Sequence, residues 1–62
     1  MASEETRRLL KALGIAVTDY EEALGRGAAA EELARADAEV GARLQQVAEL
    51  LERLRARAPS RT

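Results

Sequence analysis

The sequence predicts an all-α protein made of two helices that fold back on each other as an antiparallel hairpin. Alanine, leucine, glutamate and arginine dominate the composition, and these residues favour helix. Two stretches of the chain repeat apolar residues at spacings of three and four, which is the pattern of one apolar helix face. Gly25 and Gly27 interrupt this pattern between the two stretches, and there we expect the turn.

The first helix is expected over residues 4–24. Ser3 is a suitable N-cap, and Glu4 and Glu5 place carboxylates at the positive end of the helix dipole. The apolar stripe that follows keeps the helical spacing over its whole length. It consists of Leu10, Leu13, Val17, Tyr20 and Leu24, flanked by Leu9, Ala16 and Ala23.

Gly14 permits an alternative with three helices. The first helix would end there, and Thr18 with Glu21, which have the spacing of a capping box, would begin a short second one. We prefer one continuous helix because the apolar stripe passes Gly14 without a change of phase. A glycine inside a helix is also tolerated at about 1 kcal/mol.

The second helix is expected over residues 29–58, after a turn at 25–27. Pro59 ends it because proline cannot donate the backbone hydrogen bond that a helix needs. Residues 59–62 are predicted to be a frayed tail of the single domain that residues 1–62 form. The apolar repeat of this helix consists of Leu33, Val40, Leu44, Val47, Leu51, Leu54 and Ala58.

Five glutamates lie four residues before an arginine, an orientation that stabilises a helix by about 0.2–0.5 kcal/mol per ion pair. The expected pairs are Glu4 with Arg8, Glu22 with Arg26, Glu31 with Arg35, Glu39 with Arg43, and Glu49 with Arg53.

The size of the chain predicts that it needs a partner. A domain of 62 residues buries little of its surface, and this one has no cysteine for disulfides and no histidine for a usual zinc site. The net charge of −1 favours neither nucleic acid nor an anionic membrane as that partner. No apolar run approaches the roughly 20 residues of a membrane span, and the first residues do not resemble a secretion leader. We therefore expect a cytoplasmic protein, without cofactor or metal, that binds itself or another helical protein.

Pairing about a turn at Arg26 places Leu9 near Leu44 and leaves the second helix roughly two turns longer than the first. An apolar overhang would result, which is economical only if another chain covers it. In a homo-oligomer this contact would complete a four-helix bundle with packing like that of a coiled coil. The predicted partner-binding residues are Val47, Leu50, Leu51 and Leu54.

Three other features leave alternatives open. Gly14 and Gly41 lie at about the same level, where they either let the helices approach closely or are simply tolerated. Asp37 either occupies the seam between the helices or points to solvent while Ala36 makes the contact. Ile15, opposite the apolar stripe, is either a lone exposed residue or a contact for a partner.

No catalytic arrangement is evident. Neighbouring acidic residues point about 100° apart on a helix and cannot act on one atom, so we expect no enzyme and no small-molecule substrate. An alternative function is nucleic-acid binding through the basic end of the second helix. Cations are favoured there in any case by the helix dipole, and no aromatic residue is available for base stacking. The residues concerned are Arg53, Arg55, Arg57 and Arg61.

A leucine-rich helix, the turn Leu24-Gly25-Arg26-Gly27-Ala28, and a longer helix from Glu31 to Ala58 follow one another along the chain. In this order the chain resembles the small helical-hairpin co-chaperones of type III secretion needle subunits. The resemblance covers most of the chain in architecture and in the Arg-Gly turn, and no individual functional residue is carried over. It implies a cytoplasmic helper that pairs with a second chaperone and keeps a needle subunit from polymerising early. A hairpin that dimerises into a four-helix bundle fits the same residues.

Overall fold

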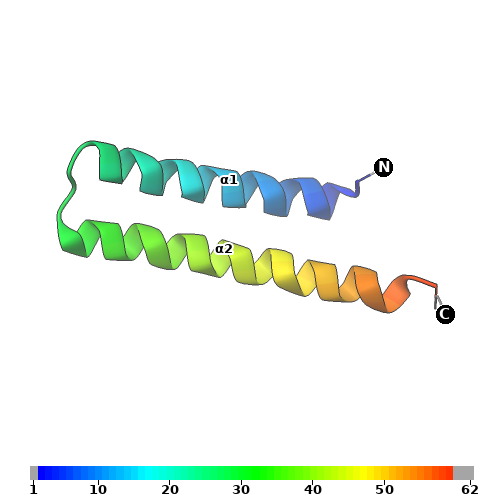
Figure 1. The fold of residues 1–62 in the computed structure, drawn as a ribbon. Helices are drawn as coiled ribbons and strands as arrows, with labels where there is room; N and C mark the ends of the chain where they lie inside the picture. Colours follow the sequence, from blue (N-terminus) through cyan, green and yellow to red (C-terminus); the bar gives the residue numbers. More distant parts are fainter. Residues whose placement is uncertain (1, 60–62) are drawn as a thin grey trace.

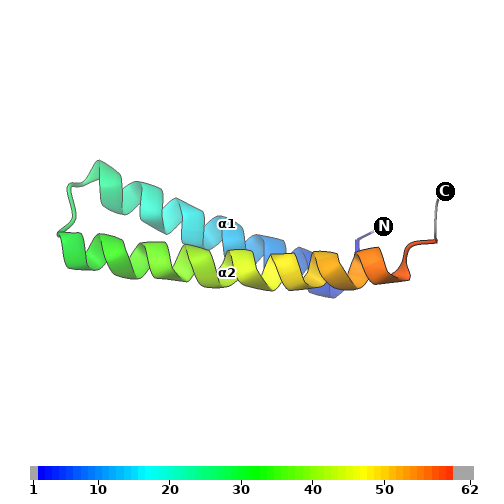
Figure 2. The same ribbon diagram turned by 60° about the horizontal axis from the view of Figure 1, so that its bottom comes forward.

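The computed structural model, which describes residues 2–59, is an antiparallel hairpin of two helices (Figure 1). α1 spans Glu4–Gly25 and α2 spans Ala30–Arg57, so the predicted all-α fold and both helix ranges are confirmed to within one residue. α1 lies alongside α2 in both views of the ribbon (Figures 1 and 2). Most of the expected frayed tail, residues 60–62, lies outside the described residues.

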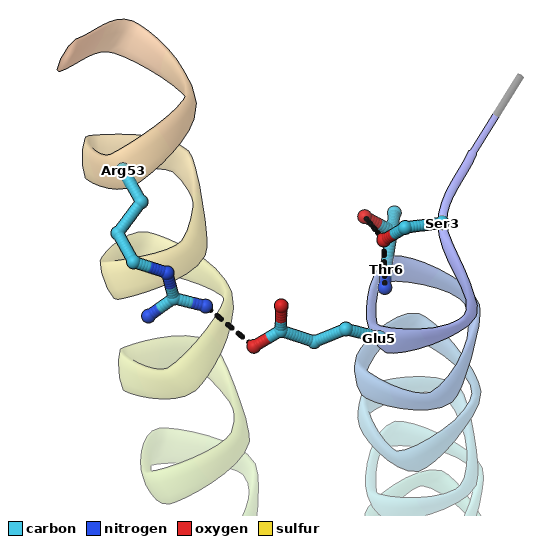
Figure 3. Close-up of polar contacts among 4 residues, drawn as sticks. All are labelled: Ser3, Glu5, Thr6 and Arg53. Carbon is cyan, nitrogen blue, oxygen red and sulfur yellow. Dashed lines mark hydrogen bonds and ion pairs between the residues drawn. The ribbon is translucent and has the colours of Figure 1, made fainter. Parts of the chain in front are cut away.

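Ser3 begins α1 as expected. Its backbone is extended, and its hydroxyl accepts a hydrogen bond from the backbone N–H of Thr6 at 3.1 Å (Figure 3). The helix then continues for 22 residues without a break at Gly14. The alternative with three helices is therefore wrong, because the unbroken apolar stripe outweighs the small cost of one glycine.

Two backbone hydrogen bonds end α1 and turn the chain. The N–H of Ala28 donates to the carbonyl of Ala23 at 3.0 Å, and the N–H of Gly27 donates to that of Leu24 at 3.2 Å. This arrangement is a Schellman motif, which requires a left-handed residue after the helix. Gly27 supplies it with a φ of 69°, a conformation in which a side chain would be strained. The predicted glycine turn is thus confirmed, with Gly27 as the residue on which it depends.

α2 begins without a side-chain cap. Ala29 has the extended backbone of an N-cap residue, but its methyl group cannot accept a hydrogen bond from the first turn. Glu31 and Glu32 lie in that turn and favour it through the helix dipole. The stability of α2 therefore comes mainly from its packing against α1 rather than from its own ends.

The helices meet along one narrow seam. Only Ala16, Ala23 and Leu50 are buried among the described residues. The molecule measures 49 × 20 × 16 Å, and its radius of gyration of 15.1 Å exceeds the about 11 Å expected of a compact chain of this length. The hairpin is therefore a single layer of two helices, in which each helix has one protein neighbour.

The register of the hairpin differs from the predicted one. Pairing Leu9 with Leu44 would place Glu5 beside Ala48, but the carboxylate of Glu5 forms an ion pair with Arg53 (Figure 3). The difference is about one helical turn. It arises because the turn of the chain extends beyond Gly27 to Ala29, so that α1 reaches further along α2 than a turn centred on Arg26 allows.

Gly14 and Gly41 do not let the two helices approach closely. A Cβ atom added to either glycine would meet nothing within 4 Å, which leaves only the interpretation that the hairpin tolerates them. Both residues are exposed and lie away from the seam.

Replacing Gly27 with alanine tests the turn. We expect Gly27→Ala to lower the free energy of unfolding by about 1 kcal/mol, because alanine is strained at positive φ. Gly25→Ala is the matched control, since Gly25 is the last helical residue and does not have positive φ. Chemical denaturation followed by circular dichroism, at one protein concentration, measures both. Equal destabilisation by the two variants would contradict the assignment of the turn to Gly27.

Candidate functional site

The candidate site is a face of exposed apolar side chains. Among residues 2–59, seven large apolar residues are exposed. On α1, Leu10, Val17 and Leu24 follow one another at intervals of seven, and on α2 Leu44 and Leu51 do the same. Seven residues make almost two helical turns, with a drift of only about 20°, so each set forms one line along its helix.

These two lines lie on the same face of the hairpin. Each residue of the two lines comes one position after a residue of the seam in the sequence. Val17 follows the buried Ala16 on α1, and Leu51 follows the buried Leu50 on α2. One step along a helix rotates the side chain by about 100° in the same sense. Viewed along the axis of α1, α2 runs in the opposite direction, so its side chains rotate in the opposite sense. The seam side of α2 also faces the opposite way, toward α1, and this second reversal cancels the first. Both lines therefore emerge on one side of the helix pair.

Half-buried residues connect these lines to the seam. Leu13 and Tyr20 on α1, and Val40 and Val47 on α2, lie between the buried positions and the exposed lines. Leu54 continues the series of Val40 and Val47 and is 41% exposed. We call the whole surface the apolar face. It consists of Leu10, Leu13, Val17, Tyr20 and Leu24 on α1, with Leu33, Val40, Leu44, Val47, Leu51 and Leu54 on α2.

The opposite face is polar around one exposed apolar residue. Ile15, 54% exposed, lines a shallow hollow with Ala12, Ala16, Asp19, Glu39 and Arg43. Nε of Arg43 donates a hydrogen bond to Glu39 at 2.8 Å, which fixes a charged pair at the rim of this hollow. Ile15 is therefore an isolated apolar residue on a charged surface, and its contact with a partner stays a prediction.

The predicted partner-binding residues have different environments. Leu51 and Leu54 are 43% and 41% exposed, Val47 is half-buried, and Leu50 is buried at 6%. The expectation that Leu50 lies in the uncovered overhang of α2 was wrong, because the first turn of α1 covers this residue. Ser3 and Thr6 line the same hollow as Leu50, and the shifted register brings them there.

Apolar exposure is also not confined to the overhang. All predicted partner-binding residues belong to the overhang, but Leu10 and Leu44, which the expected pairing places inside the hairpin, are 50% and 51% exposed. A single neighbouring helix covers only one side of each stripe, and these stripes are wider than one seam. The sequence signal for this was the width of the stripe, since the apolar residues occupy three adjacent lines on each helix.

Asp37 points away from the seam. It is exposed, whereas Ala36 before it is half-buried, which agrees with the interpretation that Ala36 and not Asp37 faces α1. Asp37 precedes Leu44 by seven residues and therefore lies on the exposed line of α2. It places one carboxylate on an otherwise apolar line.

The ion pairs only partly follow the expected spacing. Glu39 pairs with Arg43 as predicted, but Arg26 pairs with Glu32 and Arg53 with Glu5. In the described part of the chain, the other predicted partners form no ion pair. The observed pairs are largely exposed, so each contributes at most about 1 kcal/mol.

Within residues 2–59 no polar or charged side chain is buried, and no three potential metal-ligating side chains come together. Neither described helix is long and apolar enough to cross a membrane. What this arrangement provides is two exposed lines of apolar side chains, a surface that can pack into the grooves of other helices.

No protein-family model matches the chain, and no curated protein or solved structure is significantly similar to it. The resemblance to co-chaperones of type III secretion therefore stays a prediction.

The different environments of Leu50 and Ile15 predict different effects on stability. Leu50→Ala is expected to lower the free energy of unfolding by about 2–4 kcal/mol, because it empties a buried site between the helices. Ile15→Ala, on the polar face, is expected to change it by less than about 0.5 kcal/mol. Urea unfolding of both variants at the same protein concentration measures the difference. A similar loss for the two would mean that Leu50 is not part of the seam.

Proposed function

We propose that this chain is a non-enzymatic interaction module, whose apolar face binds helices of another chain and completes a helical bundle. The observation that carries the proposal is the one-sided distribution of exposed apolar residues. Six of the seven lie on the apolar face, and Ile15 alone lies on the other side. Scattered exposure is ordinary in monomers, whereas a continuous apolar surface is typical of a binding site.

The exposed area supports this function. The chain exposes 5067 Å², whereas a compact monomer of 6.7 kDa is expected to expose about 3,900 Å². The excess is about 1,200 Å². A stable protein interface buries about 800 Å² on each partner, so covering the apolar face would account for most of this excess.

Burial of this face would also stabilise an assembly. Covering the exposed half of a leucine side chain contributes about 1 kcal/mol, so the five exposed leucines and Val17 together contribute about 5 kcal/mol per chain before the entropic cost of association. The whole stability of a small domain is of the same order. Binding through this face and folding of the hairpin are therefore expected to be coupled.

The proposed surface is larger than the predicted overhang. It keeps Val47, Leu51 and Leu54 and extends along α1 to Leu10 and Leu24. A co-chaperone in the cytoplasm, as the resemblance implies, would use the same face for an amphipathic helix of its client. Nucleic-acid binding is less well supported, because Arg53 and Arg55 are paired with Glu5 and Glu52.

A matched pair of variants tests the apolar face. Leu10 and Ile15 have similar size and are 50% and 54% exposed, but they lie on opposite faces. We expect Leu10→Ser to raise the dissociation constant of the assembly more than about tenfold, because about 1 kcal/mol of burial is lost on each chain of a dimer. Ile15→Ser is expected to leave the constant within about twofold. Sedimentation equilibrium measures both.

Equal effects of Leu10→Ser and Ile15→Ser would contradict the proposed face. If the parent chain stays helical but monomeric up to millimolar concentration, self-assembly is excluded and a different helical protein is the partner. Loss of its binding in Leu10→Ser, but not in Ile15→Ser, then tests the same face.

A further inference from the structure

A line of three residues borders the apolar face on the side of α1 away from α2. Arg7, Gly14 and Glu21 are exposed and lie seven residues apart on a continuous helix, so they form one line. Gly14 follows Leu10 by four residues, and Glu21 follows Val17 by four, which places this line directly beside the exposed leucine line. Along α1, the edge of the apolar face therefore carries a cation, a glycine and an anion in this order.

This order is complementary to itself under a twofold rotation. Arg7 and Glu21 are equally far from Gly14, about 10.5 Å along the helix axis. If two α1 helices cross antiparallel at Gly14, Arg7 of each lies beside Glu21 of the other. Among the described residues neither side chain forms an ion pair within the hairpin. Both are therefore available for such a contact.

We propose that the partner of the apolar face is a second copy of this chain, with α1 packed antiparallel against α1 of the second copy about a twofold axis at Gly14. This inference rests on the proposed function and specifies its partner. The two hairpins stack face to face, and every helix in the resulting four-helix bundle is antiparallel to its neighbours.

The glycines support the position of the axis. Nothing in the hairpin requires a glycine at position 14 or 41, since neither has positive φ and a Cβ atom would meet nothing within 4 Å. A glycine inside a helix weakens it, so a close neighbour outside the hairpin gives these residues a physical reason. At the axis Gly14 meets Gly14 of the partner subunit, where the missing side chain lets the helices approach.

α2 also carries a glycine near this level, with small residues on both sides of it. Glu39 and Arg43 line a hollow together with Ala12, Ile15, Ala16 and Asp19, so Gly41 lies within about one helical turn of the level of Gly14. Ala34 and Ala48 lie seven residues before and after Gly41. An axis that passes Gly14 therefore also passes near Gly41, with small residues placed symmetrically around it on α2.

The other twofold arrangement does not use the charges. Stacking α1 on α2 of the second copy would set Arg7 and Glu21 opposite the small side chains at 48 and 34. The line of Arg8, Ile15 and Glu22 has the same order of charges, but it lies on the polar face with one isolated apolar residue. Only the Arg7 line combines complementary charges with a continuous apolar surface, and the Arg8 line supplies its control.

Charge reversal tests the contact. Arg7→Glu and Glu21→Arg each turn two attractive pairs of the dimer into repulsive ones, so we expect each to raise the dimer dissociation constant about tenfold at low salt. The double variant, with both charges exchanged, is expected to restore it to within about threefold. Arg8→Glu and Glu22→Arg change the same charges on the opposite face and are expected to have less than about twofold effect. Sedimentation equilibrium gives the constants, and circular dichroism shows that helicity is retained.

A single cysteine tests the axis independently of affinity. The chain has no cysteine, so Gly14→Cys introduces one thiol per copy. At a twofold axis the Cα atoms of the two cysteines lie within about 7 Å of each other, which is the limit for forming a disulfide. We expect rapid oxidation of Gly14→Cys to a disulfide-linked dimer, and at least about tenfold slower oxidation of Ile15→Cys.

The outcomes separate the two proposals. If Leu10→Ser weakens assembly but the charge reversals do not, the antiparallel α1 contact is wrong and the proposed function stands. Equal oxidation of Gly14→Cys and Ile15→Cys, or a double charge exchange that fails to restore assembly, also overturns the inference. A chain that never dimerises overturns it as well.

Discussion

Two helices share only one seam, and this constraint determines the rest of the structure. Each helix carries apolar residues on three adjacent lines, but its single neighbour covers the innermost line and part of the next. Small residues such as Ala16 and Ala23 fill the buried positions of α1, so the larger side chains lie beside the seam rather than in it. The folded hairpin therefore leaves its most apolar surface about half exposed to water.

The fold was predictable because its signals are local. Ser3 at the start of α1, the glycines at its end and the helical spacing of the leucines act within a few residues of each other. Gly14 did not lead to a wrong prediction, because the helical spacing of the apolar residues continues through it. The C-terminal proline likewise ends α2 close to the expected residue.

The register and the site were less predictable, for one reason. Sliding α2 by one helical turn preserves the spacing of its apolar residues, so the pattern alone cannot select one register. The choice depends on the path of residues 26–29 and on contacts such as that of Glu5 with Arg53. The predicted overhang depended on this register, and it therefore included Leu50, which α1 covers, and left out Leu10 and Leu24, which α1 leaves exposed.

The Schellman turn at Gly27 also determines whether α1 packs against α2 of the same chain or of another chain. Its left-handed residue separates two segments that otherwise have the composition to continue as one long helix. If residues 26–29 all adopted helical angles, α1 and α2 would continue as one straight helix, and each would find its antiparallel neighbour only in another molecule. Domain swapping of this kind uses the same contacts as the closed hairpin. The backbone angles of residues 26–29 thus separate a self-contained hairpin from an exchanged pair of extended helices.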